Sequence, residues 1–267
     1  GKDVLRAARL RLRGQKLVEL GEPLAGLSSL RDAALIGGPT EHLAYAQQRA
    51  RSGDLDGAIE STQDAIDYFT TGQGRLHTTL AAEAFAAQAG LFRRQGRDLE
   101  AVARLENALT LVRRQDPIAL KVRCRILDEL GLAYQKLDDL ETARDRLQTC
   151  LDERTAAGLK VDQAQSHINL ARLEVASGGI ALAVEHAESA QATLRGLPPS
   201  ALHANAEVLC AQLKIRTDQH AAGVAHAERA LVMNRQIANK RGEAISLLVL
   251  AQCYGGAGDA ESALMTL

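Results

Sequence analysis

A small residue recurs at the same place in a long repeating pattern, and this recurrence constrains the fold of the 267-residue chain more than any other feature. Seven anchor positions, 32 to 43 residues apart, hold Gly or Ala: Gly14, Ala46, Ala89, Gly131, Ala171, Ala211 and Ala251. The positions twelve residues after each anchor also hold only Gly or Ala: Gly26, Ala58, Ala101, Ala143, Ala183, Gly223 and Ala263. Side chains that are always small indicate places where neighbouring helices cross closely. A repeat of this length predicts a solenoid of stacked helices.

The positions between these small residues predict a turn in every repeat. Seven residues after each anchor the chain holds Gly or Asp: Gly21, Gly53, Gly96, Asp138, Gly178, Asp218 and Gly258. Gly and Asp suit a left-handed residue at the end of a helix. Nineteen residues after the first six anchors come further small residues: Ala33, Ala65, Ala108, Cys150, Ala190 and Ala230. Each repeat is therefore expected to be a pair of helices joined by a tight turn.

One segment carries a recognisable motif. Leu130-Gly131-Leu132-Ala133-Tyr134 precedes Asp138-Asp139-Leu140-Glu141-Thr142-Ala143, which Leu147 follows. This resembles the tetratricopeptide (TPR) signature, with Leu147 in the place of the usual Phe. The spacing of the anchors is similar to the long-period subclass of about 40 residues, as in bacterial maltose-activator-like regulators and kinesin-light-chain-like adaptors. Three repeats depart from the signature, with Arg49, Glu174 and Lys214 where Tyr is expected.

The resemblance implies an all-α fold, a right-handed superhelical solenoid of about seven TPR helix pairs. We expect a single solenoid over residues 1–267, with repeats at approximately 5–36, 38–70, 79–113, 121–154, 162–195, 202–235 and 242–267. The pattern begins within a few residues of Gly1 and stops inside the last pair. We therefore expect the chain to be a fragment of a longer protein.

Composition excludes several classes of protein. The chain has 32 Lys and Arg against 33 Asp and Glu, without the basic excess of a general nucleic-acid or membrane-surface binder. It has no apolar run of membrane-spanning length. The four cysteines have no metal-binding spacing and are expected to be free thiols, Cys124, Cys150, Cys210 and Cys253. These features favour a cytoplasmic protein.

The sequence offers no catalytic motif. It has no phosphate-binding loop, no GxSxG and no HExxH. Of the seven histidines, only His203 shares a helical face with a nearby carboxylate, that of Glu207 four residues on. Two ligands do not make a metal site, and a surface pair is the simpler interpretation. We expect no enzyme activity, no metal and no cofactor.

A binding groove is the stronger candidate. The resemblance implies that the first helix of each pair lines the concave surface of the solenoid. Positions one and five residues after the anchors are mostly amide or basic, and would suit a peptide backbone and acidic groups. Asn169 lies two residues before its anchor, where TPR peptide clamps often place an Asn. The candidate binding residues are Gln47, Arg51, Arg94, Lys136, Asn169, Arg172, Gln212, Arg216 and Gln252. Simple solvation of an exposed helix face would also explain such a stripe.

Two functions follow from the resemblance. The first is a scaffold module that binds a protein or peptide, with acidic groups preferred, in the concave groove. The second is a ligand-sensing or oligomerising regulatory domain of a bacterial signalling protein, whose effector (a transcription regulator or nucleotide cyclase) lies outside this chain. We expect no direct contact with nucleic acid or membrane. Apolar residues such as Leu264 and Leu267 in the last repeat predict a homodimer.

Overall fold

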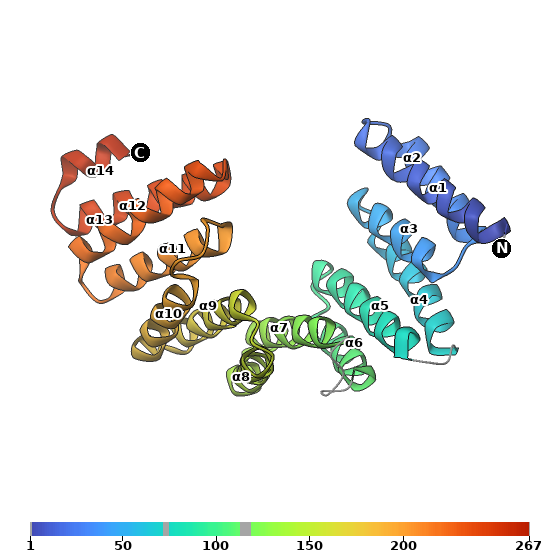
Figure 1. Cartoon of the computed structure of the whole chain (residues 1–267), viewed down its shortest axis with the longest axis horizontal. Coiled ribbons are helices and arrows are strands. Elements are labelled where there is room, and N and C mark those ends of the chain that lie inside the picture. The colour runs from blue at the N-terminus through green and yellow to red at the C-terminus, as the bar shows by residue number, and fades with distance from the viewer. Residues whose placement is uncertain (1, 72–74, 113–118, 267) are drawn as a thin grey trace. The chain divides into compact units, whose positions relative to one another are not determined.

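The computed structural model describes residues 2–71, 75–112 and 119–266, and all of their side chains except those of residues 75–77. Within these residues the chain forms fourteen α-helices and no strand, as the repeat predicts (Figure 1). Positions 113 and 267, the predicted ends of two repeats, lie outside the described residues. The helices belong to two compact units, residues 1–139 and 140–267. The prediction of one continuous solenoid stays a prediction.

The first unit holds seven helices. They are α1 (Lys2–Glu19), α2 (Pro23–Ile36), α3 (Pro39–Arg51), α4 (Leu55–Thr71), α5 (Arg75–Arg94), α6 (Asp98–Leu111) and α7 (Leu120–Lys136). Each helix packs against the next along the chain, and α5 also touches α7. Proline at the start of α2 and α3 fits the first helical turn, where its missing N–H has no partner to lose.

The second unit holds the other seven helices. They are α8 (Leu140–Ala156), α9 (Lys160–Ser177), α10 (Ile180–Leu194), α11 (Ala201–Arg216), α12 (His220–Gln236), α13 (Lys240–Gly256) and α14 (Ala260–Thr266). Here too each helix packs against its neighbour in the chain. The odd-numbered helices α9, α11 and α13 also touch one another in order. First helices of successive pairs therefore share one face, which we call the first-helix face.

The small anchor residues lie where the helices cross. All seven anchors are buried, and so are all but one of the residues twelve positions later. The exception is Ala263, which is half-buried in the last helix. Between α1 and α2 the approach leaves no room for a side chain: a Cβ atom on Gly14 would lie 2.8 Å from the carbonyl oxygen of Gly26. The predicted role of the small residues is confirmed.

The predicted turns also have the predicted backbone. All seven turn residues adopt a positive φ angle, from 55° at Asp218 to 93° at Gly53. Only five are glycines, because an aspartate tolerates the left-handed region better than most residues do. Within each unit the turn reverses the chain, so that consecutive helices pack side by side (Figure 1).

The cores of both units are built largely from alanine. In the second unit, one cluster packs Ala164, Ala171, Ala183, Ala187 and Ala190 with a few leucines. Alanine is the strongest helix former and allows close packing of helix backbones. The low aromatic content of 3% therefore matches a core of closely packed thin helices.

Candidate binding surfaces on the first helices

The sequence-predicted binding residues all lie on odd-numbered helices. Seven of the nine line one of two cavities, and each cavity belongs to a single unit. Arg172, Gln212, Arg216 and Gln252 share a cavity in the second unit. Gln47, Arg51 and Arg94 share another in the first. We call these the second-unit cavity and the first-unit cavity.

The second-unit cavity lies across three first helices. It has a volume of about 430 Å³, and its polar residues come from α9, α11 and α13. The apolar part of its wall is Val175, Leu209, Leu213 and Ile215. Spacings of one and five residues after the anchor place these side chains beside one another, because residues four apart lie on one helical face. The surface therefore combines an apolar floor with cationic and amide groups.

The cations of the second-unit cavity have no side-chain partner among the described residues. Arg172 and Arg216 are both exposed, and no described carboxylate or carbonyl accepts a hydrogen bond from either guanidinium. The same holds for the side-chain amides of Gln212 and Gln252. None of the described residues that line the cavity is acidic. Two guanidiniums and two amides are thus available to an external carboxylate or peptide group.

The first-unit cavity, of about 450 Å³, has a different charge pattern. Besides Gln47, Arg51 and Arg94, it is lined by the ionised groups of Glu83, Arg125 and Glu129. Glu129 accepts a hydrogen bond from Arg93, and Arg125 lies 3.8 Å from Glu83.

Arg94 donates to the backbone oxygen of Ala50 over 2.8 Å, which fixes its side chain across the α3–α5 contact. Within the described residues, Arg51 alone among the lining arginines has neither a hydrogen bond nor an ion pair. It also lines a smaller cavity of about 300 Å³ with Gln15 and Glu19 of α1.

The remaining two predicted residues lie outside both cavities. Lys136 is exposed at the end of α7, and its Nζ atom lies 2.9 Å from a carboxylate oxygen of Asp98. Asn169 is only 7% exposed, and its side-chain oxygen accepts a hydrogen bond of 2.9 Å from Gln165. Their part in binding stays a prediction.

Sequence reasoning missed the buried ion pairs of the second unit. Glu174 stands where the TPR signature has Tyr, and it is 2% exposed. Arg144 of α8 donates to both of its carboxylate oxygens, the shorter bond being 2.6 Å. These hydrogen bonds hold the pKa of Glu174 below its usual range despite burial. The departure from Tyr at this position could have indicated an ion pair, because a charged side chain in a core position requires a partner.

The interpretation of His203 and Glu207 as a surface pair was wrong. Both side chains are buried, but Glu207 accepts hydrogen bonds from His226, Gln191 and Arg229 instead. These partners come from α10 and α12, so the spacing along α11 alone did not reveal them.

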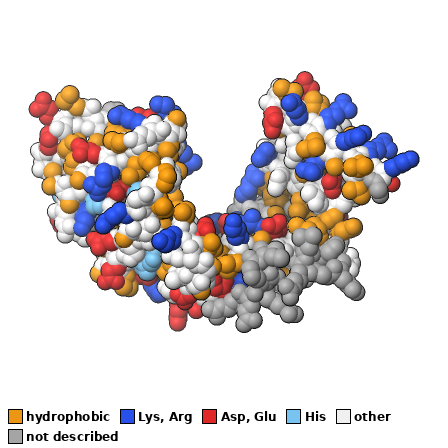
Figure 2. All heavy atoms as spheres, viewed as in Figure 1, with side chains coloured by type: hydrophobic (Ala, Val, Ile, Leu, Met, Phe, Trp, Pro, Cys, Tyr) orange, Lys and Arg blue, Asp and Glu red, His pale blue; other side chains and the backbone are white. Residues whose placement is uncertain are grey.

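Charged side chains of both signs lie on the surface of both units. On the face seen in Figure 2, basic, acidic and apolar side chains are interspersed over both units, in keeping with the balance of 32 basic and 33 acidic residues. Among the described residues, no three His, Cys, Asp or Glu side chains lie together as a metal site would need. None of the described helices combines the length and apolarity that a membrane span requires.

The chain is similar in fold to solved structures whose sequences differ widely from its own. No family model and no curated protein matches the chain. Solved structures do match. BtubC (BKLC) from P. vanneervenii is 18% identical with a TM-score of 0.71, over 80% of this chain and 88% of that chain.

Two further structures extend the comparison. Aspartyl phosphate phosphatase F from Bacillus subtilis is 11% identical with a TM-score of 0.70, over 99% of this chain and 69% of that chain. The TPR-like repeats of a kinesin light chain from Podosopora anserina are 19% identical with a TM-score of 0.60, over 71% and 92% of the two chains. At these identities the likeness concerns the fold alone. Together with the buried anchors and left-handed turns, it shows that the chain has a tetratricopeptide-type fold, an all-helical solenoid of helix pairs.

Proposed function

We propose that the chain is a protein- or peptide-binding module, and that the second-unit cavity is its principal binding site. The observation that carries the proposal is that Arg172 and Arg216, which have no partner among the described residues, line one cavity together with the apolar Leu209 and Leu213. Exposed arginines near apolar surface and free amides are groups that interfaces use for recognition. The partner that fits is a peptide segment with acidic side chains, its apolar residues on the floor.

The fold neighbours support protein binding in general terms. One of them, Cut9, was solved in a hetero-tetramer with Hcn1, with a TM-score of 0.60 and 14% identity to this chain. That assembly belongs to Cut9, and it is an example of a protein with this type of fold in a complex with another protein. The choice of face in the present chain rests on its own side chains.

Selection of peptides from a random display library tests this function without a known partner. The full chain is the bait, beside an Arg172→Glu/Arg216→Glu variant. We expect wild type to enrich peptides that carry Asp or Glu next to apolar residues, and the variant to lose this enrichment. A matched variant, Arg235→Glu/Arg241→Glu, reverses two exposed charges of the same unit outside the cavity and should behave as wild type. Equal enrichment by all three proteins would refute the site.

A second candidate function is a sensing or oligomerising domain of a larger bacterial regulator. One comparison favours it: the match to aspartyl phosphate phosphatase F takes in 99% of this chain but 69% of that chain. A chain of this fold can therefore form part of a longer protein. Sedimentation of the purified chain tests the oligomerising arm. A concentration-dependent dimer would support it, and a monomer at high concentration would exclude self-association.

A further inference from the structure

A second pair of cavities lies on another side of the second unit, between α10 and α12. One has a volume of about 350 Å³ and the other about 480 Å³. They share three residues, Gln191, Arg195 and His226, which stand between them. None of the three lines the second-unit cavity on the first-helix face. The two sites share the apolar residue Leu213, which lines both the smaller cavity and the second-unit cavity. Their polar residues differ, so the paired cavity is a distinct site, and it does not depend on the proposed function.

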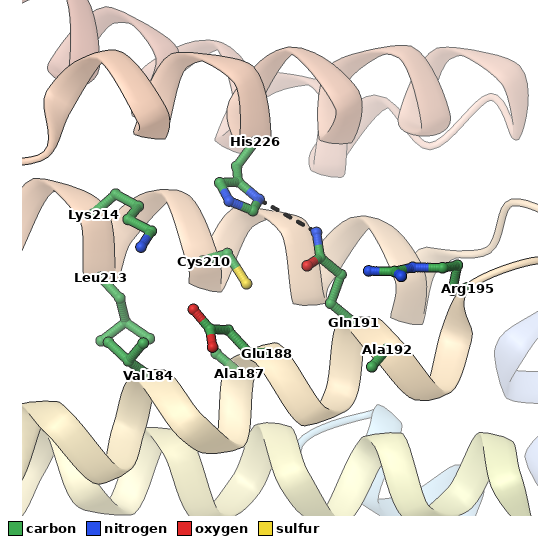
Figure 3. Close-up of a pocket in the computed structure, with 10 residues that line it drawn as sticks. All are labelled: Val184, Ala187, Glu188, Gln191, Ala192, Arg195, Cys210, Leu213, Lys214 and His226. Carbon is green, nitrogen blue, oxygen red and sulfur yellow. Dashed lines mark hydrogen bonds between the residues drawn. The ribbon is translucent and has the colours of Figure 1, made fainter.

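The smaller cavity is amphipathic (Figure 3). Val184, Ala187 and Leu213 line it with apolar groups. Glu188, which lies next to Ala187 on α10, adds a carboxylate. Figure 3 shows the guanidinium of Arg195 pointing along α10 toward Gln191, whose amide nitrogen lies 3.5 Å from Nδ1 of His226. Seven residues, about two helical turns or ~10 Å, separate Glu188 from Arg195. The smaller cavity is thus lined by one carboxylate, that of Glu188, which lies between two cations, Lys214 and Arg195 (Figure 3).

The larger cavity is lined by a buried carboxylate that accepts three hydrogen bonds. Glu207 is 2% exposed, and it accepts hydrogen bonds from His226 at 2.7 Å and Gln191 at 2.8 Å. Arg229 donates a third, at 3.2 Å. Burial alone would raise the pKa of Glu207, but these bonds lower it to about 2. Because the carboxylate is ionised, it balances the charge of Arg229, whose guanidinium also lies 2.8 Å from Nδ1 of His226.

In the same cavity, His203 has a ring nitrogen without a hydrogen-bond partner among the described residues. Its side chain is 8% exposed and lines the cavity wall. Its Nδ1 atom is buried, and no described residue forms a hydrogen bond with it. A buried ring nitrogen without a partner is costly, which indicates that the position is suited to a ligand group.

Arg195 supplies the unbalanced charge. It is exposed at the end of α10 and lines both cavities, and its guanidinium has no hydrogen bond or ion pair with any described residue. Lys214, the other cation of the smaller cavity, donates to the neutral amide of Gln219, which does not balance its charge. Together the two cavities are lined by three cations, Arg195, Lys214 and Arg229, and by two carboxylates, Glu188 and Glu207, which leaves one net positive charge. A single carboxylate would neutralise it, whereas a multiply charged anion would be repelled by Glu207 and Glu188.

We propose that the paired cavity binds a small organic monocarboxylate, with its carboxylate between Arg195 and His203 and its apolar part against Val184 and Leu213. A guanidinium binds a carboxylate through two parallel hydrogen bonds, and His203 Nδ1 adds a third donor. The volumes fall within the range of small-molecule sites. Cys210 also lines the smaller cavity, but burial raises the pKa of its thiol to about 12, which disfavours the thiolate form.

Titration of the full chain with hexanoate and 4-phenylbutyrate tests the proposal. Their neutral primary amides serve as isosteric controls, and inorganic phosphate serves as a general anion. The imidazole signals of His203 and His226 are followed by NMR, after assignment with His203→Gln. We expect saturable shifts with a dissociation constant on the order of 1 mM for at least one carboxylate. The matching amide should bind at least about tenfold more weakly, because it lacks the charge-assisted bonds.

Variants locate the site. Arg195→Gln, an exposed substitution outside the core, should weaken carboxylate binding about tenfold. Arg241→Gln removes an exposed arginine of the same unit outside the cavity and should leave binding unchanged. Three results would each overturn the proposal: no saturable shift with either carboxylate, equal binding of the amide, or tighter binding of phosphate than of both carboxylates. Retention of full affinity in Arg195→Gln would overturn it as well.

Discussion

The two first-helix cavities are built from equivalent positions of the repeat, yet their charges differ. In the second-unit cavity Arg172 and Arg216 have no partner among the described residues. In the first-unit cavity Arg94 donates to a backbone oxygen and Arg125 lies beside Glu83. The repeat position of a side chain therefore sets its exposure. Whether that side chain is free to bind depends on the helices packed beside it.

Charge reversal should have the largest effect and separates the two cavities most clearly. For an acidic peptide selected on the full chain, Arg172→Glu/Arg216→Glu should weaken binding about 100-fold, because two free cations become repulsive. Arg51→Glu/Arg94→Glu should weaken it by about tenfold or less, since Arg94 is already bonded within the protein. Isothermal titration calorimetry measures both. The reverse order of effects would place the principal site in the first unit.

Overpacking a crossing point should affect both units alike. Ala58 in α4 and Ala183 in α10 occupy the same repeat position and are 0% exposed. Leucine at either site should lower the free energy of unfolding by roughly 1–3 kcal/mol, because neighbouring helices must move apart. Thermal unfolding followed by circular dichroism reports the loss. Ala181→Leu, on an exposed position of α10, is the control and should leave the melting temperature nearly unchanged. A loss in one unit only would mean that the two repeats are packed differently.

Mild acid should destabilise the second unit in particular. His167 and His186 are half-buried with their Nδ1 atoms 3.2 Å apart. Burial lowers the pKa of both, and the proximity of His186 lowers that of His167 further, while Glu174 and Glu185 act on His186 in the opposite direction. Because the folded pKa values lie below the unfolded one, the unfolded state binds more protons as the pH falls. The stabilisation is complete above about pH 6.5 and declines below it.

The measurement is the melting temperature at pH 7.5 and pH 5.5. Wild type should lose stability over this interval, and His167→Gln should lose less, because one of the two titrating rings is absent. Hydrogen exchange at each pH then assigns the loss to helices, with α9 and α10 expected to open before α3 and α4. An equal decline in wild type and variant would show that the histidine pair does not titrate.

The smallest effect is expected at Lys136. Its Nζ atom is 2.9 Å from Asp98, and exposed pairs of this kind contribute about 0–1 kcal/mol. Lys136→Met should therefore change peptide affinity by about twofold or less. A loss as large as that of the Arg172→Glu/Arg216→Glu variant would extend the binding surface to the end of α7.

Local features of the fold followed from the sequence because the repeat encodes them directly. Ala171 and Ala211 are buried, as the recurrence of small side chains predicts. Asp138 and Asp218 have a left-handed backbone, as their turn positions predict. The exposure of Arg172 and Arg216 followed from the same periodicity. What could not be predicted depends on contacts between repeats. Glu174 is bound by Arg144, thirty residues earlier on the preceding helix.

The paired cavity illustrates the same limit. His203 and Glu207 were expected to be a surface pair on one helix, but α10 and α12 cover them. Helical spacing predicts neighbours within a helix, whereas the bonding of Glu207 is set by side chains from two other helices.

The most direct test of the principal binding site is NMR of the arginine side chains during titration with the selected acidic peptide. The Nε–H signals of Arg172 and Arg216 should shift together and saturate at one equivalent, while that of Arg235, which is paired to Glu243, should not move. Saturable shifts confined to other arginines, with Arg172 and Arg216 unchanged, would contradict the account.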